Sequence, residues 1–237
     1  MCGDLYECAG GAMYGGSAVR CKFYDNKAIW CGGAICKGSA VKCSFVSNSA
    51  NRGGAIDGGS AVGCSFKNNR ASDGGAMSKG SAVKCVFTAN SAYNGGATWH
   101  VTAKNCKFIK NQANNYGGAM YEGRPVNCVF KSNKAKVFGN NLYKSTNIVA
   151  SDVSTVYKAN KYIVATVNDF DGRPIRGVKV TIKVGNLKKT MKTNSKGQVK
   201  LSIKNLAPKS YAAEITCAGN KNYVESSKTV KVTVKKR

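Results

Sequence analysis

The chain has 237 residues, enough for one large or two smaller domains that each bury a core. Its 27 glycines, 3 prolines and 43% hydrophobic residues exclude a collagen-like or a disordered chain. The 37 lysines and arginines against 11 acidic residues give a formal net charge of +26, spread over both halves. This charge favours loose association with any polyanion, such as nucleic acid, acidic glycan or anionic cell-wall polymer, without selecting among them.

Two kinds of targeting segment are missing from the sequence. There is no apolar run of the roughly 18 residues that a transmembrane helix needs, so no transmembrane segment is expected. No secretory signal peptide is visible after Met1 either, because a basic start and an apolar segment are both absent.

The first 150 residues are dominated by an internal repeat. A Gly-Gly-Ala triplet begins at Gly10, Gly32, Gly53, Gly74, Gly95 and Gly117, with spacings of 21 or 22 residues. Three further residue types recur in step with the triplet and form columns: Cys21, Cys43, Cys64, Cys85, Cys106 and Cys128; Phe23, Phe45, Phe66, Phe87, Phe108 and Phe130; and Asn26, Asn48, Asn69, Asn90, Asn111 and Asn133. A fixed period of this length is the signature of a repeat architecture.

Each repeat contains short β segments and no helical periodicity. The segment Val19–Phe23 alternates apolar and cationic residues, which predicts a strand with one buried face. Two more strands are expected, at the Gly-Gly-Ala stretch and around the Asn-x-Ala stretch. Such a unit buries its apolar side only by stacking on the next copy, with buried asparagines bonding the backbone of adjacent turns. Residues 1–150 are therefore predicted to form a right-handed parallel β-helix of about six to seven turns of 21–22 residues, in an all-β fold.

The repeat is incomplete at both ends. Gly139–Leu142 occupies the register of the next Gly-Gly-Ala triplet and predicts a degraded seventh turn. Asp4 falls 22 residues before Asn26, where a residue of the asparagine column is due. The chain is thus expected to open inside a turn without a capping repeat, as a fragment or a truncated domain.

The cysteine column is interpreted as structural. Its six side chains are expected to point inward and pack as small apolar groups, although adjacent turns about 4.8 Å apart leave disulfides open. A straight column cannot give zinc four tetrahedral ligands, and no Cys-x-x-Cys pair occurs, so no metal site is expected. Cys31 and Cys36 are neighbours in sequence without a second pair or histidines nearby. So many thiols suit a reducing or anoxic habitat.

A different pattern follows the repeat. Residues 151–160 are expected to be a linker, and residues 161–237 contain short alternating strands separated by turn signals at 169–174 and 194–197. This pattern predicts an immunoglobulin-like β-sandwich, with Cys217 in its core, that acts as a spacer. The expected strands are Lys161–Asn168, Val178–Val184, Val199–Ile203, Tyr211–Cys217 and Lys228–Val234.

The Gly-Gly-Ala and Phe-x-x-Asn elements resemble the polymorphic outer-membrane-protein repeats of chlamydial surface proteins. The second domain, from Lys161 through Asn194–Gly197 to the final lysines, looks like the immunoglobulin-like repeat of adhesin-like proteins from methanogenic archaea. The order of the two domains is similar as well. This resemblance implies attachment at the cell surface, but it supplies no ligand and no functional residues to transfer.

An enzymatic alternative stays open, because parallel β-helices also host polysaccharide lyases and glycoside hydrolases. Glycoside hydrolysis needs two converging carboxylates, and elimination needs clustered acids with a base. Asp57 and Asp73 lie in adjacent repeats but in different columns, and the single histidine, His100, has no acidic residue next to it in the sequence. The other acids of the repeat are Asp4, Glu7, Asp25 and Glu122. No catalytic residue, cofactor site or metal ligand is therefore predicted.

A second alternative is non-specific polyanion binding through an outward column that contains Arg20, Lys42 and Lys84. This column is broken by Gly63, Asn105 and Asn127 and lacks the aromatic row that single-stranded nucleic acid requires, so no specific nucleic acid is expected. The preferred hypothesis is a non-enzymatic, adhesin-like protein at the cell surface. Its expected partners are a surface glycan or protein, or an anionic cell-wall polymer, bound through the β-helix.

Overall fold

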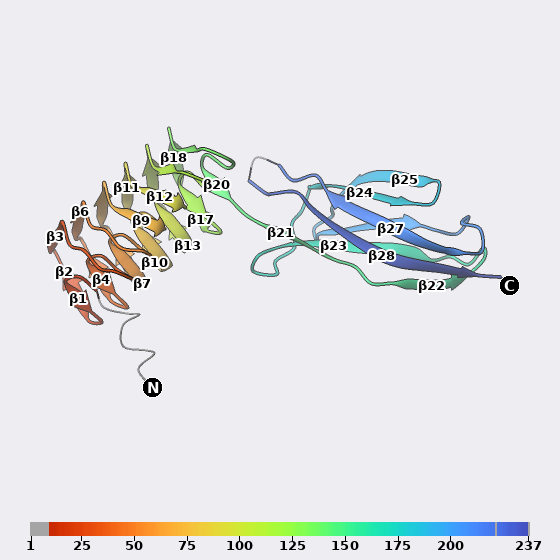
Figure 1. Ribbon diagram of the computed structural model, residues 1–237, viewed down its shortest axis with the longest axis horizontal. Coiled ribbons are helices and arrows are strands. Elements are labelled where there is room, and N and C mark those ends of the chain that lie inside the picture. The colour runs from red at the N-terminus through yellow and green to blue at the C-terminus, as the bar shows by residue number, and fades with distance from the viewer. Residues whose placement is uncertain (1–9, 221, 237) are drawn as a thin grey trace. The chain divides into compact units, whose positions relative to one another are not determined.

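The structure is a computed structural model that describes residues 10–220 and 222–236 (Figure 1). Asp4 and Glu7, with the expected opening of the repeat, lie outside the described residues. The chain divides into two compact units, residues 1–143 and residues 144–237. The described part of both units consists of strands and connecting loops. It contains no helix of the length and apolar character needed to cross a membrane.

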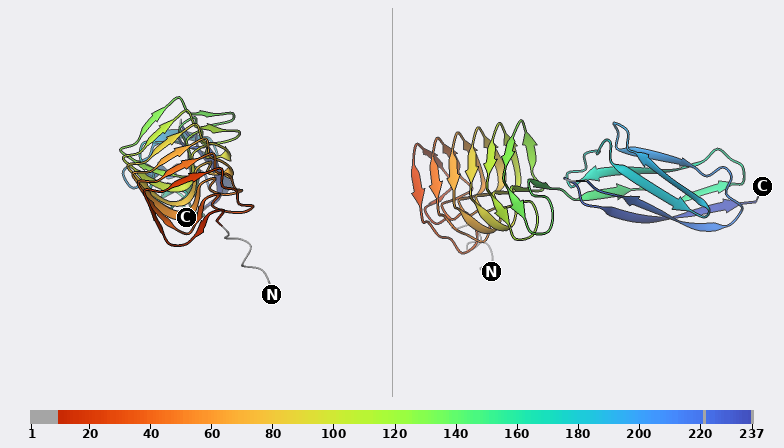
Figure 2. Two further views of the ribbon diagram at one scale, coloured as in Figure 1. Left: turned by 90° about the vertical axis from the view of Figure 1, so that its left-hand side faces the viewer. Right: turned by 90° about the horizontal axis from the view of Figure 1, so that it is seen from above.

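Unit 1 is a parallel β-solenoid of about six turns, which confirms the predicted β-helix. Its described strands form three parallel sheets, in which strands from successive turns lie side by side (Figure 2). Sheet A contains β1 (Met13–Tyr14), β2 (Ser17–Val19), β4 (Ile35–Cys36), β5 (Ser39–Val41), β7 (Ile56–Val62), β10 (Met77–Val83), β13 (Thr98–Lys104), β16 (Met120–Tyr121), β17 (Arg124–Val126) and β20 (Leu142–Tyr143). Sheet B contains β3 (Lys22–Tyr24), β6 (Ser44–Val46), β8 (Ser65–Lys67), β11 (Val86–Thr88), β14 (Lys107–Ile109) and β18 (Val129–Lys131). Sheet C contains β9 (Arg70–Asp73), β12 (Ser91–Asn94), β15 (Gln112–Ala113) and β19 (Lys134–Ala135).

The register of these sheets places like residues above one another. Phe45 pairs with Phe66 on the next turn, and Ala82 pairs with Ala103. The phenylalanine rings stack along the whole column with centroids 4.8 to 5.1 Å apart and interplanar angles between 3° and 11°. The degraded seventh turn keeps this register, because Leu142 pairs with Met120 and is buried.

The Gly-Gly-Ala triplet is required by two different constraints. Its first glycine has a positive φ, as in Gly53 with φ 58°, which only glycine adopts without strain. Its second glycine has no room for a side chain, since a Cβ on Gly54 would lie 2.2 Å from the carbonyl oxygen of Gly75. The triplet therefore forms a tight corner where one turn contacts the next.

The predicted strand through Val-x-Cys-x-Phe is wrong, because the chain turns a corner inside it. The residue before each column cysteine has a positive φ, as in Lys42 with φ 53°, and this divides the segment into β5 and β6. The valine before that corner consequently faces outward: Val19 is 58% exposed and Val62 41%. Alanine, cysteine and phenylalanine make the buried face. Hydrogen bonds such as Lys42 N–H to the Val62 carbonyl, at 2.8 Å, hold the strained corner.

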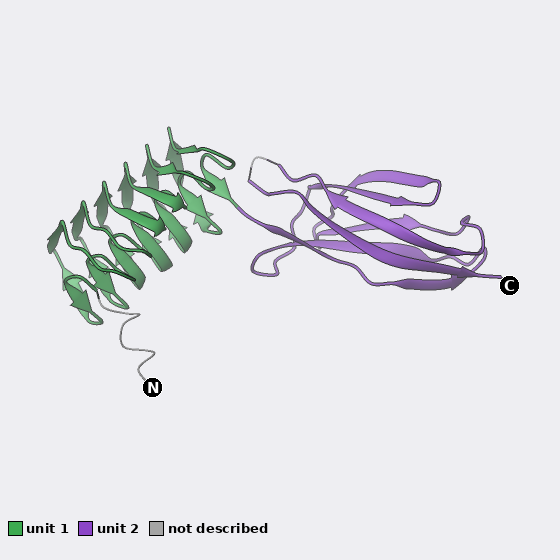
Figure 3. Ribbon diagram, viewed as in Figure 1, with its two compact units in different colours: residues 1–143 green, residues 144–237 purple. Residues whose placement is uncertain are grey.

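Unit 2 contains one sheet of three described strands and one of five (Figure 3). The first consists of β21 (Thr146–Val149), β23 (Tyr162–Asp169) and β26 (Gln198–Ser202). The second consists of β22 (Val153–Val156), β28 (Ser226–Lys235), β27 (Ser210–Cys217), β24 (Lys179–Val184) and β25 (Leu187–Lys192). Apolar side chains from both sheets form one buried cluster, which includes Cys217.

The boundary between the units differs from the predicted one. The solenoid ends at Tyr143, seven residues before the expected position 150. The expected linker, residues 151–160, contains β22, and this strand pairs in parallel with β28. The residues just before the expected linker form β21, which pairs antiparallel with β23. These two short strands exist because of partners distant in sequence, so local alternation did not reveal them. Strand β25 was missed for a different reason: it pairs with the neighbouring β24, but most of its residues are exposed, so it has no apolar alternation.

A cationic groove on the solenoid

A groove follows the corner between sheets B and C. At this corner every described turn has a residue with positive φ, for example Ser47 (57°), Asn68 (56°) and Lys110 (53°). The next residue is the column asparagine, which points inward and is fully buried at Asn90. Because the chain turns and then sends a side chain inward, two outward columns flank a channel along the solenoid.

The buried asparagines hold the base of this channel. The Asn90 amide donates to the Phe66 carbonyl and to Asn111 Oδ1, both at 3.0 Å. Its own Oδ1 accepts from the backbone N–H and the side chain of Asn69, at 3.0 and 2.9 Å. Asn48, Asn69 and Asn111 repeat these bonds with their own neighbouring turns. The flanking columns are therefore kept at the strand spacing of about 4.8 Å.

The groove has a volume of about 700 Å³ and a polar, basic lining. Its cations are Lys27, Arg70 and Lys110, all exposed. The remaining polar lining residues carry hydroxyl or amide groups: Ser47, Ser49, Asn68, Asn90, Ser91 and Gln112. No carboxylate is among the lining residues, although the exposed Asp25 lies in the corner column one turn before Ser47.

The cations alternate with neutral turns. Lys27, Arg70 and Lys110 belong to every second turn, and serines occupy the turns between them. Successive cations are thus about 10 Å apart along the axis, twice the strand spacing. Along the axis the groove thus presents one positive charge about every 10 Å, with Lys27 and Arg70 in the column after the asparagines and Lys110 in the column before them.

A second hollow of about 300 Å³ adjoins the groove and shares Arg70, Ser91 and Gln112 with it. Tyr93 lines this hollow and is 56% exposed. An exposed ring beside cations and hydroxyls is the combination that sugar binding uses, because a sugar ring offers both apolar C–H groups and polar hydroxyls.

The sequence-predicted polyanion residues lie elsewhere. Arg20, Lys42 and Lys84 are exposed corner residues with φ between 53° and 55°, at the corner between sheets A and B. They share one column but line neither hollow. The groove cations Lys27 and Arg70 each directly follow a column asparagine, and that offset was the overlooked signal in the sequence.

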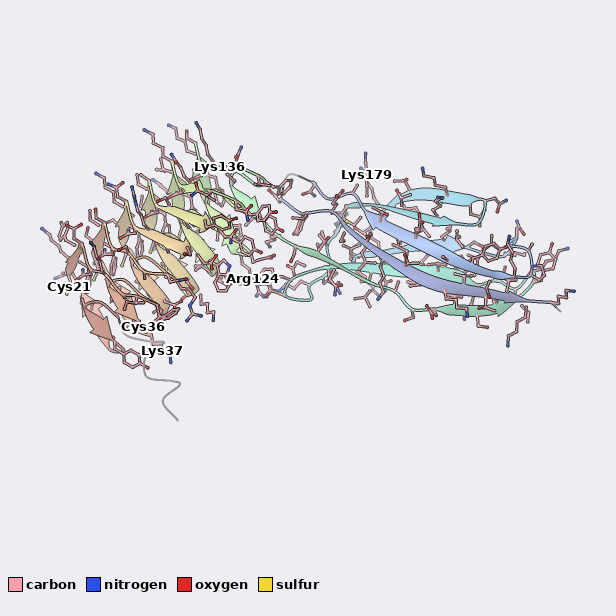
Figure 4. The ribbon with its side chains drawn as sticks, in the orientation of Figure 1. Cys21, Cys36, Lys37, Arg124, Lys136 and Lys179 are labelled. Carbon is pink, nitrogen blue, oxygen red and sulfur yellow. The ribbon has the colours of Figure 1, made fainter. Side chains whose placement is uncertain are left out.

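The six column cysteines are part of the core rather than of a reactive site. Cys43, Cys64, Cys85 and Cys106 are buried, Cys128 is half-buried, and Cys21, labelled in Figure 4, is exposed at the end of the column. Each thiol donates to backbone carbonyls at 3.3 to 3.5 Å. Contact with the Cys106 and Cys64 thiols, together with burial, raises the pKa of Cys85, which keeps it protonated.

The phenylalanine and asparagine columns are likewise internal. Phe45, Phe66, Phe87 and Phe108 are fully buried, whereas the terminal Phe23 and Phe130 are partly buried against the core. The asparagines from Asn48 to Asn133 are buried, and Asn26 is half-buried at the end of the column. These columns position the groove without lining it, except for Asn90.

The acidic residues considered for catalysis do not gather in the groove. Asp57 is buried, with its carboxylate 3.8 Å from the Arg52 guanidinium, and Asp73 accepts a 3.1 Å hydrogen bond from the Asn94 side chain. His100 is half-buried with its ring edge-on to Trp99 at 4.2 Å. Among residues 10–220 and 222–236, no three His, Cys, Asp or Glu side chains are arranged to hold a metal ion.

Comparison with protein-family models, with curated proteins and with solved structures found no significant match.

Proposed function

We propose that the solenoid is a non-enzymatic, adhesin-like binding module that holds an acidic polysaccharide in the groove between sheets B and C. The observation that carries this proposal is the lining: Lys27, Arg70 and Lys110 on alternate turns, with hydroxyl and amide groups between them and no carboxylate. A linear glycan with one acidic group per disaccharide matches that spacing. Exposed cations contribute about 0.5–1 kcal/mol each, so the attachment is weak and grows with the number of turns engaged.

The sequence resemblance to adhesin-like surface proteins supports this role. We infer that unit 2 is an immunoglobulin-like domain, since two sheets enclose one apolar cluster in it. It acts as a spacer, and the protein works at the cell surface or outside the cell. An anionic cell-wall polymer belongs to the same chemical class of partner as an acidic glycan.

The groove also bears on the enzymatic alternative. Glycoside hydrolysis canonically uses a pair of carboxyl groups beside the bond to be cleaved, and the lining has none. Binding without turnover is therefore the function that this lining favours. Polygalacturonate incubated with the protein is expected to release neither reducing ends nor the ultraviolet-absorbing product of elimination. Either product would support a lyase or hydrolase instead.

The decisive experiment compares two double variants of equal charge. Arg70→Gln with Lys110→Gln removes two groove cations, whereas Lys42→Gln with Lys84→Gln removes two cations from the other corner. At about 0.5–1 kcal/mol per cation, the groove variant should bind hyaluronate, which has one carboxylate per disaccharide, roughly 5- to 30-fold more weakly than the parent chain. The control variant should change affinity by about two-fold at most.

Neutral dextran and double-stranded DNA serve as comparison ligands in the same titrations. Equal losses for both double variants, or equal affinity for DNA and for the acidic glycans, would show charge-driven adhesion without a site. Loss of all binding at moderate salt in both variants would lead to the same conclusion, because exposed charges are screened beyond about 10 Å at 0.1 M salt.

A further inference from the structure

Cys31 and Cys36 stand apart from the six column cysteines. They lie on either side of one Gly-Gly-Ala corner, separated by Gly32–Ile35, and their Sγ atoms are 3.3 Å apart. Both are buried, with exposures of 0% and 1%. Cys36, labelled in Figure 4, ends β4, and Cys31 forms a parallel bridge with Arg52 of the next turn.

The same two positions contact each other in other turns. Arg52 and Asp57 are the equivalents in the next turn, because Arg52 pairs with Cys31 and Asp57 with Cys36, and they form an ion pair at 3.8 Å. Two aromatic rings occupy these positions in the last turn, where Phe138 and Tyr143 meet edge-on at 6.2 Å. The solenoid thus brings these positions together in two further turns, although the side chains there differ in chemistry.

From this juxtaposition we propose that Cys31 and Cys36 form an intrachain disulfide that closes the corner of their turn. A disulfide has an S–S length near 2.04 Å, so the two sulfur atoms need to approach by roughly 1.3 Å. A small rotation about the two Cα–Cβ bonds provides this movement. The bond is the covalent counterpart of the Arg52–Asp57 ion pair one turn away.

The disulfide forms during folding, because the folded chain buries both sulfur atoms. One thiolate of the pair attacks a low-molecular-weight disulfide, such as oxidised glutathione, and one glutathione thiolate leaves. The second protein thiolate then attacks the mixed disulfide and releases the other glutathione thiolate. The pair loses two protons and two electrons, and the oxidant becomes two molecules of glutathione. Once folded, the bond is shielded from reductants.

The column cysteines are not expected to react in the same way. Cys43, Cys64 and Cys85 each donate a hydrogen bond to the backbone carbonyl of an alanine in the preceding turn, at 3.3 to 3.4 Å. Their sulfur atoms also accept from the backbone N–H of the preceding column cysteine, at 3.4 Å. These contacts hold the column thiols in the core packing.

The chain offers a direct test, since trypsin cleavage after Lys27 and Lys37 yields a peptide, residues 28–37, whose only cysteines are this pair. Full-length protein is reduced, unfolded and refolded in a mixture of oxidised and reduced glutathione, then alkylated under denaturing conditions and digested. The peptide is expected to be two hydrogen atoms lighter and unalkylated. The peptides with Cys43 (43–52) and Cys64 (53–67) should each carry one alkyl group.

The double variant Cys31→Ser with Cys36→Ser provides the control. The parent chain refolded with oxidised glutathione should need a higher urea concentration for unfolding than the reduced parent, and the variant should show no such difference. Two alkyl groups on peptide 28–37 after oxidative refolding would overturn the proposal. Stoichiometric zinc with both thiols reduced, or disulfides that join column peptides instead, would overturn it as well. The outcome is independent of glycan binding.

Discussion

The asparagine column makes a quantitative prediction for the solenoid's stability. In Asn90→Ala, four side-chain hydrogen bonds disappear: those to the Phe66 carbonyl and Asn111 Oδ1, and the two accepted from Asn69. All four are buried, and a buried hydrogen bond contributes about 1 kcal/mol net. The expected loss in free energy of unfolding is therefore about 4 kcal/mol, with a range of roughly 3–5 kcal/mol because unpaired groups remain.

The measurement is urea-induced unfolding followed by tryptophan fluorescence. The only two tryptophans of the chain, Trp30 and Trp99, are in unit 1, so the signal reports on the solenoid alone. The matched control is Ser91→Ala, at the next residue, which is half-buried and lines the groove; its expected cost is at most about 0.5 kcal/mol. A loss below about 1.5 kcal/mol for Asn90→Ala, or a loss equal to that of the control, would refute the claim that this column joins the turns.

Two further predictions use the same unfolding assay. Gly54→Ala should lower the free energy of unfolding by more than about 3 kcal/mol, because its Cβ would lie 2.2 Å from the Gly75 carbonyl oxygen. Gly58→Lys should lower it by less than about 1 kcal/mol, since Lys37 already has the equivalent positive φ of 56° in the preceding turn. Similar losses for the two variants would contradict this reasoning. Burial, with a smaller contribution from Tyr143, raises the pKa of Tyr121 from 10.0 to about 12. The folded state therefore favours the protonated phenol, so its contribution to stability is complete below pH 10 and is lost as the pH rises through about 12. Tyr121→Phe should flatten the decline in unfolding midpoint over this range, and parallel declines for parent and variant would exclude the effect.

The repeat could be recognised from sequence because stacking turns the period into a physical ladder. Once Phe45 and Phe66 occupy the same column, each turn repeats the contacts of the last, and a matching residue every 21 or 22 positions is the direct consequence. The same logic gave the correct register for Leu142 in the degraded turn. Cys217 also followed from local alternation, which suffices for a strand with one buried face.

The corners could not be located in this way. Val19 and Phe23 have the spacing of one strand face, but the positive φ of Arg20 rotates the chain between them and leaves Val19 exposed. Non-glycine residues with positive φ leave little trace in sequence, since the backbone bonds of the neighbouring turn compensate their strain. The groove depends on these corners, so alternation alone did not separate its cations from those of the Arg20, Lys42 and Lys84 column, although the position of Lys27 and Arg70 directly after a column asparagine would have done so.

The sequence by itself determined the period, the buried columns and the β character of both halves, because these depend on residue type and spacing. Only the tertiary structure decided where the chain turns, which cations share a groove, and that Cys31 meets Cys36 across a glycine corner. It also decided that residues 146–149 and 153–156 are strands of the second unit. Each of these features depends on contacts between residues distant in sequence or on backbone angles, and a local sequence pattern encodes neither those contacts nor those angles.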